Sequence, residues 1–236
     1  MADSPRLVLA RRFARELRRE EGANLVAVGV YGSVARGKER AHSDLDLLVV
    51  VREKRPSLGI QMREGVLVTL LQCTPAEARD EVCGSRADLN AALAGWRSMR
   101  PLYDPRRLLR DLRARAARPS RRQFRSAARR ALLETYEDLG KLRNAVAAGD
   151  PDEAREMAVW FTGGAMGALF DLDEHILATG RQAFSELRRW GPIGRDIRAL
   201  RYDSHPLPEA LRLAEGIWSS LLRRAARAGV PADDLP

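Results

Sequence analysis

The chain of 236 residues has little cysteine and no long apolar segment. Its two cysteines, Cys73 and Cys83, fit reduced structural thiols better than a disulfide or a metal site. Because no run of about 18 apolar residues occurs, the sequence excludes a transmembrane helix. The N-terminus also lacks the apolar core of a signal peptide. We therefore expect a cytoplasmic protein with no membrane partner.

Lysine is scarce as well, with 3 lysines beside 38 arginines, and acidic residues are too few to balance them, so the net charge is +9. Residues 97–130 hold 13 arginines against two acids, Asp104 and Asp111. Such a stretch could attract nucleic acid. No series of aromatic residues for base stacking accompanies it, however. We favour a solvated helix surface and keep nucleic acid as an open but less favoured partner.

Hydrophobic periodicity predicts an α+β fold in two domains. A helix is expected from Pro5 to Gly22, and strands are expected at 25–30, 45–51 and 66–71, with another helix beginning at Thr74-Pro75 and a short extended piece at 102–103. Helices are then expected at about 105–117, 120–148, 151–179, 182–190 and 207–229. The composition changes near residue 118. The prediction is a small mixed β-sheet with flanking helices over residues 1–118 and a helical bundle over 119–236.

One motif connects a small turn to two carboxylates. Gly32-Ser33 is followed by Asp44-Leu45-Asp46 at the start of an apolar strand. Residues at i and i+2 of a strand point to the same face, so the two aspartates lie together. Because burying like charges side by side is costly, a divalent metal ion is their expected partner. The Gly-Ser turn supplies small residues and backbone N–H groups that a phosphate can approach.

A P-loop is an alternative interpretation of the same segment. Residues 32–38 match G-x-x-x-x-G-K and follow a strand. However, Glu39 stands where a P-loop needs a magnesium-binding Ser or Thr, and the next strand begins too soon for the long helix that a P-loop opens. The P-loop interpretation is therefore disfavoured.

The turn, the spacer of residues 34–43 and the Asp-x-Asp strand together resemble the nucleotidyltransferase superfamily. Three further segments, 100–104, 137–144 and 165–168, are similar to segments of the kanamycin (aminoglycoside) nucleotidyltransferases. This resemblance covers about residues 30–190. It implies a nucleotidyltransferase-type sheet domain followed by a helical domain, and a homodimer with active sites between subunits.

The resemblance also implies roles for individual residues in nucleotidyl transfer. Asp44 and Asp46 would hold Mg²⁺, and the turn residues Gly32 and Ser33, with Arg36, would bind the triphosphate of ATP or another nucleoside triphosphate.

The helix segment 137–144 is assigned the remaining catalytic roles. Glu137 would take the proton of the acceptor hydroxyl as general base, and Lys141 would bind the α-phosphate or the leaving pyrophosphate. Without the resemblance, Glu137 and Lys141 would be interpreted as an ordinary surface ion pair at i, i+4.

The sequence departs from the family at one position. A third carboxylate is expected on the strand after the Asp-x-Asp strand, where this chain has Thr69, and Glu64 just precedes that strand. The acceptor is less defined. Acids and a histidine in the predicted helix 151–179 could hold an amino sugar, or could be a solvated helix face; they are Asp171, Asp173, Glu174 and His175.

We therefore predict a Mg²⁺-dependent transferase that moves a nucleoside monophosphate to a hydroxyl of a small acceptor, with an aminoglycoside, and hence antibiotic resistance, as one candidate. Two alternatives stay open. One is a homologue that binds nucleotide without catalysis, favoured by Thr69. The other is an enzyme that modifies nucleic acid or protein through the arginine-rich stretch.

Overall fold

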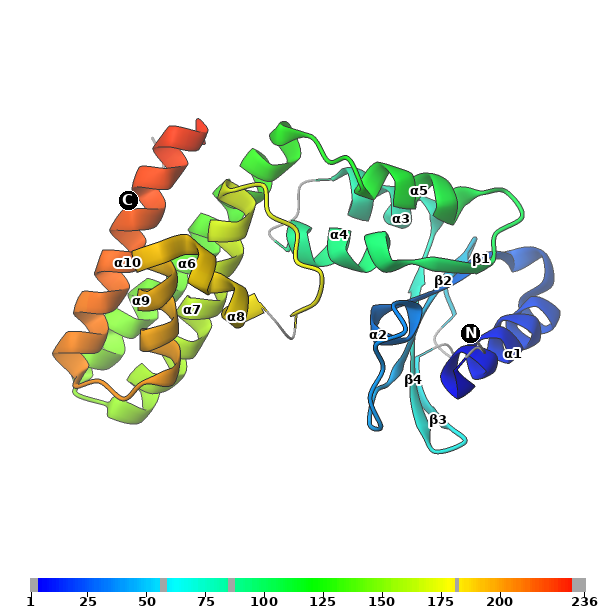
Figure 1. Cartoon of the computed structure of the whole chain (residues 1–236), viewed down its shortest axis with the longest axis horizontal. Helices are drawn as coiled ribbons and strands as arrows, with labels where there is room; N and C mark the ends of the chain where they lie inside the picture. Colours follow the sequence, from blue (N-terminus) through cyan, green and yellow to red (C-terminus); the bar gives the residue numbers. More distant parts are fainter. Residues whose placement is uncertain (1–3, 56–58, 85–87, 181–182, 231–236) are drawn as a thin grey trace. The chain divides into compact units, whose positions relative to one another are not determined.

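The computed structural model describes residues 4–55, 59–84, 88–180 and 183–230. By its contacts the chain divides into two compact units (Figure 1). The first unit comprises residues 1–84 and 92–119, and the second comprises 85–91 and 120–236. Among the described residues, no helix combines the length and apolarity needed to cross a bilayer.

The first unit is built on a mixed five-stranded sheet in the order β3-β4-β2-β1-β5. Its strands are β1 (Leu25–Tyr31), β2 (Leu45–Val51), β3 (Ile60–Arg63), β4 (Val66–Cys73) and β5 (Arg100–Tyr103). β2 pairs antiparallel with β1 and parallel with β4, so it lies in the middle of the sheet. The start of β2, which carries Asp46 and directly follows Asp44, is therefore flanked by a strand on each side.

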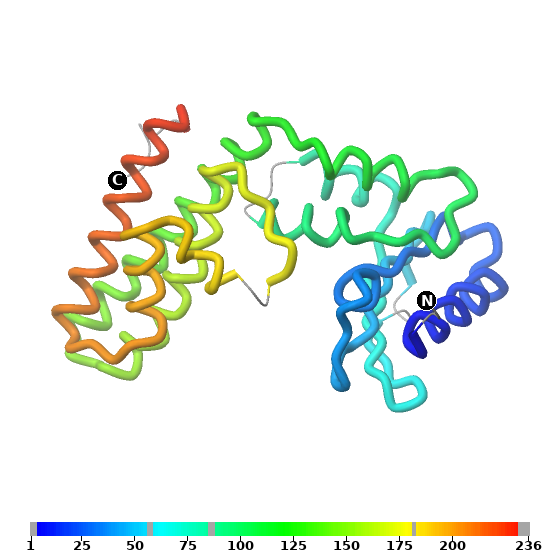
Figure 2. Tube along the Cα trace, viewed as in Figure 1, coloured from blue at the N-terminus to red at the C-terminus, as the bar shows by residue number. Residues whose placement is uncertain are grey.

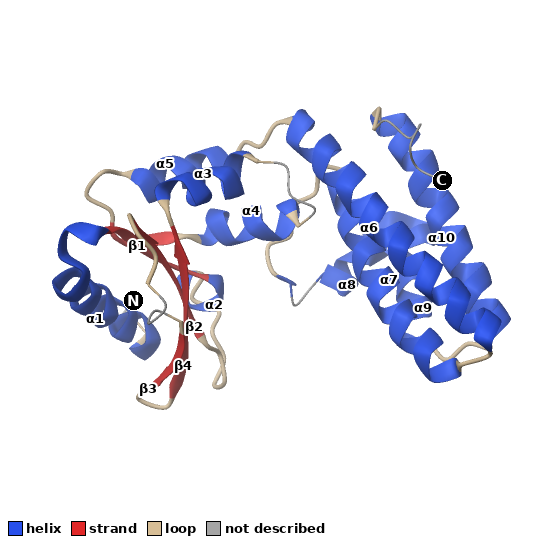
Figure 3. Cartoon of the chain, turned by 180° about the vertical axis from the view of Figure 1, so that it is seen from behind, coloured by secondary structure: helices blue, strands red, loops and turns tan. Residues whose placement is uncertain are grey.

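Alternation along the strands divides the sheet into two faces. Leu45, Leu47 and Val49 of β2 pack in one core with Leu7 and Phe13 of α1 (Pro5–Glu21). Helices α3 (Pro75–Cys83) and α5 (Leu108–Ala116) contact strands of the same sheet and each other (Figure 3). Residues of β2 that alternate with the α1-facing set point to the opposite face.

Local sequence signals explain where these helices begin and end. Ser4 caps α1 by accepting a hydrogen bond from the Leu7 N–H, and Gly22 ends the helix with a positive φ. Thr74 and Glu77 form a capping box at α3. The predicted helix at the N-terminus and the predicted strands are confirmed, and the α+β class with them.

The elements of the first half that were not predicted include a strand and a helix of the first unit, β3 and α4. β3 was missed because most of its side chains are exposed and it therefore lacks the apolar alternation of a half-buried strand. It forms because Glu64 and Gly65 both adopt positive φ, which is the geometry of a tight hairpin turn into β4. Helix α4 (Leu89–Ser98) was also missed.

The second unit is helical. Its helices α6 (Arg121–Ala148) and α7 (Pro151–Leu172) pack side by side (Figure 2). A short connection joins them, in which left-handed Gly149 ends α6, Asp150 caps α7 and Pro151 occupies its first turn. Gly164 permits their close approach, since a Cβ atom there would lie 2.7 Å from the Thr135 Oγ1. The unit also contains α8 (Ala183–Glu186), α9 (Gly191–Tyr202) and α10 (Leu207–Ala228).

Two helix predictions in this half need correction, and one helix was not predicted. The helix expected over 151–179 ends at Leu172, because Glu174 adopts a left-handed φ and the His175 N–H closes back on the Phe170 carbonyl. The helix expected over 182–190 is α8 followed by a 3₁₀ turn at Leu187–Trp190, and residue 182 lies outside the described residues. α9 was missed because Gly191-Pro192 suggests a break, whereas Pro in a first turn starts a helix.

Candidate active site

The glycine turn lies at the end of β1 beside Asp46. Gly32 begins the four-residue helix α2 (Gly32–Ala35) with φ +72°, a conformation that favours glycine. Tyr31, the last residue of β1, is the register partner of Asp46 on β2. A Cβ atom at Gly32 would overlap the Asp46 Oδ2. Glycine is therefore required here twice, by its φ and by the approach of the carboxylate.

Asp44 and Asp46 form a partly buried acidic pair. Burial, and after it the charge of Asp44, raise the pKa of Asp46 to about 6, although the charge of Arg36 acts in the opposite direction. Both side chains are partly exposed. Like charges held together in this way fit a divalent cation, because Mg²⁺ is commonly bound by one or two carboxylates and completes its shell with water and phosphate oxygens. Among the described residues, no group of three or more His, Cys, Asp or Glu side chains could hold a metal.

Ser33 follows directly in α2 and is buried. Its hydroxyl has no hydrogen-bond partner within the described part of the chain. The neighbouring Gly32 N–H donates to the Ser98 Oγ over 3.3 Å. The turn predicted to bind phosphate thus contains one polar atom without a hydrogen-bond partner among the described residues, the Ser33 Oγ.

The position of the missing carboxylate is now defined by the sheet. Thr69 on β4 is the parallel register partner of Asp46 on β2, so both side chains lie in one row across the face opposite α1. The side chain of Glu64, the nearest preceding acid in the sequence, pairs with Arg12 of α1 instead. Neither position supplies a third carboxylate beside Asp44 and Asp46.

Tyr31 adjoins this acidic pair, Glu81 lies near Tyr31, and neither was singled out from the sequence. Burial, and after it the negative charges of Asp46, Glu81 and Asp44, raise the pKa of Tyr31 to about 12. The phenol is therefore neutral and can donate a hydrogen bond. The only sequence signal for Tyr31 is its place before Gly32. Glu81, on α3, gives no sequence signal, because the packing of α3 on the sheet brings it near.

Glu137 and Lys141 lie in the second unit, on α6. The Lys141 Nζ is 2.8 Å from the Glu137 Oε1 and 3.7 Å from the Asp138 Oδ1, and it lies 5.8 Å from the centre of the exposed Trp160 ring. The hydrogen bond from Lys141 lowers the pKa of Glu137, whereas burial raises that of Asp138. The Asp138 side chain is less exposed than that of Glu137, and the sequence analysis did not predict it as a site residue.

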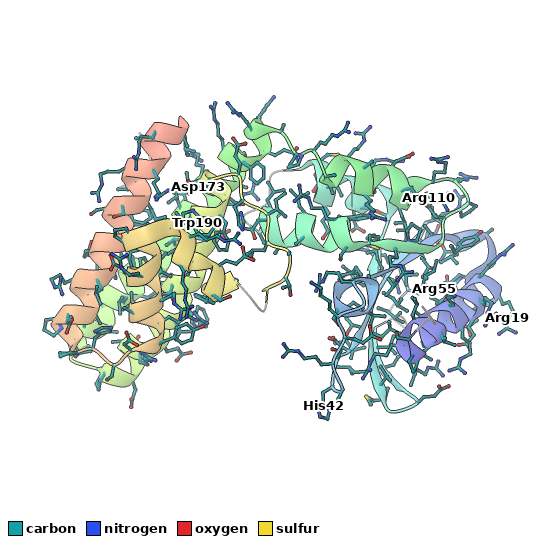
Figure 4. The ribbon with its side chains drawn as sticks, viewed as in Figure 1. Arg19, His42, Arg55, Arg110, Asp173 and Trp190 are labelled. Carbon is teal, nitrogen blue, oxygen red and sulfur yellow. The ribbon has the colours of Figure 1, made fainter. Side chains whose placement is uncertain are left out.

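The acids of residues 171–175 do not form the solvated helix face, or the free acidic patch, that the sequence left open. Asp171 is buried with its Oδ1 3.4 Å from the Asn90 Nδ2. Asp173 pairs with Arg224 at 2.9 Å and accepts a hydrogen bond from the Trp190 indole (Figure 4). Glu174 lies 3.4 Å from Arg121, and His175 lies 2.8 Å from Glu186. Asp171 is buried within the last turn of α7, whereas Asp173 and Glu174 follow the end of the helix and are exposed, each paired with an arginine of the second unit.

The P-loop interpretation is excluded by the length of α2, which has four residues rather than the long helix that a P-loop opens. His42 follows α2 and is exposed near the tip of the loop that leads to β2 (Figure 4).

Comparison with known proteins agrees with this geometry. Residues 10–86 match the family model described as nucleotidyltransferase domain. The fold is similar to the crystal structure of a nucleotidyltransferase-like protein from Exiguobacterium sibiricum 255-15, with a TM-score of 0.61 and 14% identity over 93% of this chain and 76% of that one. No curated protein sequence matches the chain. The matched residues include the Gly32 turn and both aspartates.

Proposed function

We propose that this protein is a Mg²⁺-dependent nucleotidyltransferase that moves a nucleoside monophosphate from ATP, or another nucleoside triphosphate, to a hydroxyl of a small acceptor. The observation that carries the proposal is the partly buried Asp44–Asp46 pair packed against the glycine turn inside the matched domain. The match to the family model supports transfer chemistry in general. The donor, the metal and the acceptor are our own assignments.

Asp44 and Asp46 are assigned as the magnesium ligands. When bound, Mg²⁺ supplies positive charge at the attacking and leaving oxygens of the α-phosphorus. Gly32 lets the turn approach closely, Ser33 offers its unpartnered hydroxyl to a phosphate, and Arg36 offers a guanidinium next to the carboxylates. These three residues bind and orient the triphosphate, so that the attacking hydroxyl and the leaving pyrophosphate are in line.

Glu137 and Lys141 are assigned to the acceptor and the leaving group. The hydrogen bond from Lys141 lowers the pKa of Glu137, so Glu137 becomes a stronger base for the hydroxyl proton when Lys141 turns to the phosphate. Lys141 donates to the α-phosphate or the pyrophosphate. Asp138, only 3.7 Å from Lys141, helps to hold the ammonium when Glu137 turns to the acceptor.

We assign a small hydroxylated compound as acceptor, with an aminoglycoside as one candidate supported by the resemblance of segments 100–104, 137–144 and 165–168. The acids at 171–175 give this candidate no support, since their side chains are engaged within the second unit. The cytoplasmic location and the homodimer stay predictions from the sequence.

The test is pyrophosphate release from ATP in the presence of magnesium and a panel of hydroxylated acceptors. Asp44→Asn and Asp46→Asn are expected to lower the rate by at least about a hundredfold while the fold is retained. Glu20→Gln is the matched control, because Glu20 is an exposed carboxylate on α1, which covers the other face of the sheet. A wild-type rate in either aspartate variant would show that the metal assignment is wrong.

A homologue that binds nucleotide without catalysis is the second candidate. The observation in its favour is Thr69 in register with Asp46, where the family pattern expects a third acid. Magnesium-dependent ATP binding with no pyrophosphate release across the acceptor panel would select this candidate over the first.

A further inference from the structure

One cavity of the first unit lies away from the aspartate pair. It has a volume of about 660 Å³ and is bounded by the turn before β1, the beginning of β1, helices α3 and α5, and the segment after β5. Leu25, in its lining, pairs with Val51 at the end of β2, whereas Asp46 lies at the start of that strand. Five residues of strand, about 17 Å, separate the two places. The cavity is therefore a second site on the same sheet.

Four arginines line this cavity, and Asp111 is the only acid in its lining. The Arg52 Nε donates to the Ala23 carbonyl over 3.0 Å, the Arg79 Nη1 donates to the Pro75 carbonyl over 3.3 Å, and the Arg115 Nη1 lies 3.9 Å from the Cys83 Sγ. Arg106 is the fourth. In the described part of the chain, none of them forms an ion pair with a carboxylate. Guanidinium groups in a concave wall, with few acids to neutralise them, attract a polyvalent anion.

The rest of the lining is apolar or aromatic. It includes Leu25, Val26, Leu108 and Leu112 together with Tyr103. The Tyr103 ring is already contacted by the Arg18 guanidinium, which lies 5.2 Å from the ring centre. A concave site of several hundred Å³ that combines apolar side chains with a few convergent charged groups is typical of small-molecule binding. An apolar floor beside arginines suits a ligand with a flat, uncharged part and a phosphate chain.

We infer that this cavity binds a mononucleotide, whose phosphates contact Arg79 and Arg106 and whose nucleoside covers the apolar floor near Tyr103. This site is separate from the one proposed for catalysis and needs no metal, because its charge is already positive. A nucleic-acid strand is the less suitable occupant, since the arginines converge in a hollow of nucleotide size rather than along a track.

The test is calorimetric titration of the full chain with ADP in the presence of EDTA, which removes the metal on which nucleotide binding at the aspartate pair depends. Arg79→Gln combined with Arg106→Gln removes two cavity arginines from two different elements. This variant is expected to bind ADP at least about tenfold more weakly. Asp44→Asn combined with Asp46→Asn is expected to bind ADP like the wild type. The cavity proposal can therefore be tested even if the catalytic proposal fails.

The matched control is Arg110→Gln combined with Arg113→Gln. Both arginines are exposed on α5, do not line the cavity, and carry the same total charge as the pair removed. Equal weakening by both double variants would reduce the effect to general electrostatics and overturn the proposal. So would pyrophosphate binding as tightly as ADP, or steeply salt-dependent binding of an oligouridine with no binding of ADP.

Discussion

Gly32 shows how much a single residue controls at this site. Its φ of +72° alone would make another residue strained, and Gly37, with φ +63°, has the same property. The difference lies in the surroundings, because a Cβ atom at Gly37 would have no atom within 4 Å, whereas one at Gly32 would overlap the Asp46 carboxylate. Gly32 therefore controls the position of a proposed metal ligand as well as the path of the chain.

Replacing each glycine by alanine separates these two effects. Gly37→Ala is expected to cost about 1 kcal/mol of unfolding free energy from backbone strain and to leave nucleotide binding intact. Gly32→Ala is expected to cost about 2–4 kcal/mol and to abolish manganese-dependent ATP binding, because Asp46 must move. Urea unfolding and calorimetry measure the two quantities. Equal losses in both variants would contradict the proposed role of the Asp46 contact.

Asp171 is a second residue with a strong individual prediction. It is 1% exposed, its Oδ2 has no partner among the described residues, and burial raises its pKa from 3.8 to about 8. Because the folded protein holds this proton more tightly than the unfolded chain, its contribution to stability is complete below about pH 4 and is lost as the pH rises towards 8. Asp171→Asn is uncharged and nearly isosteric, so it avoids that loss.

We expect Asp171→Asn to be more stable than the wild type above pH 8, by about 2–4 kcal/mol, with the difference shrinking on acidification. Chemical denaturation across this pH range measures it. Asp152→Asn, at an exposed position of the same helix, is the control and should show no such trend. A pH-independent difference for Asp171→Asn would show that the carboxyl group is not neutral in the folded protein.

At the scale of elements, the parallel pairing of β2 and β4 decides what can stand beside Asp46. These strands are separated in sequence by the β3 hairpin strand, yet their register places Thr69 directly opposite Asp46. Leu71 lies on the same face of β4, two residues farther along, and is 44% exposed. One strand thus offers both a site for a third carboxylate and a control about 7 Å away.

Thr69→Glu is expected to preserve or raise transferase activity and to tighten manganese binding by about tenfold, because a third carboxylate joins the pair. Leu71→Glu adds the same charge to the same strand and should change manganese affinity much less. Calorimetric titration with manganese compares them. Unfolding of Thr69→Glu would show that this position is packed core, and equal affinities in the two variants would contradict the register argument.

At the scale of the whole molecule, the chain passes between its two units more than once. Residues 85–91 group with the second unit, although the residues before and after them group with the sheet in the first unit. Within this segment Leu89 is completely buried, and Asn90 lies 3.4 Å from Asp171 on α7. The domain boundary predicted near residue 118 stays a prediction, and a cut there would remove this segment from the helical unit.

Two fragments, residues 1–119 and 120–236, are therefore expected to associate when they are produced together, since residues 85–91 complete the second unit. Size-exclusion chromatography of the co-purified pair measures association. Leu89→Glu should abolish it, because a buried charge without a partner costs several kcal/mol. Ala91→Glu places the same charge at an exposed position two residues away and should have little effect. Association that survives Leu89→Glu would contradict the grouping.

Several features could be determined from the sequence alone because they depend on neighbouring residues. Apolar runs identified β1, β2 and β4, and caps such as Ser4 identified the ends of helices. The side-by-side placement of Asp44 and Asp46 follows from the two-residue period of a strand. The need for glycine at position 32 follows from a tight turn between elements.

The tertiary structure alone decided the features that depend on residues far apart in the chain. Thr69 meets Asp46 only through the pairing of strands that are not consecutive, and Asp171 becomes buried only when α7 ends and Asn90 packs beside it. The arginine-lined cavity likewise gathers side chains from several elements. Local preference acts over a few residues, whereas burial and charge depend on which distant segments pack together, so no short pattern in the sequence could reveal them.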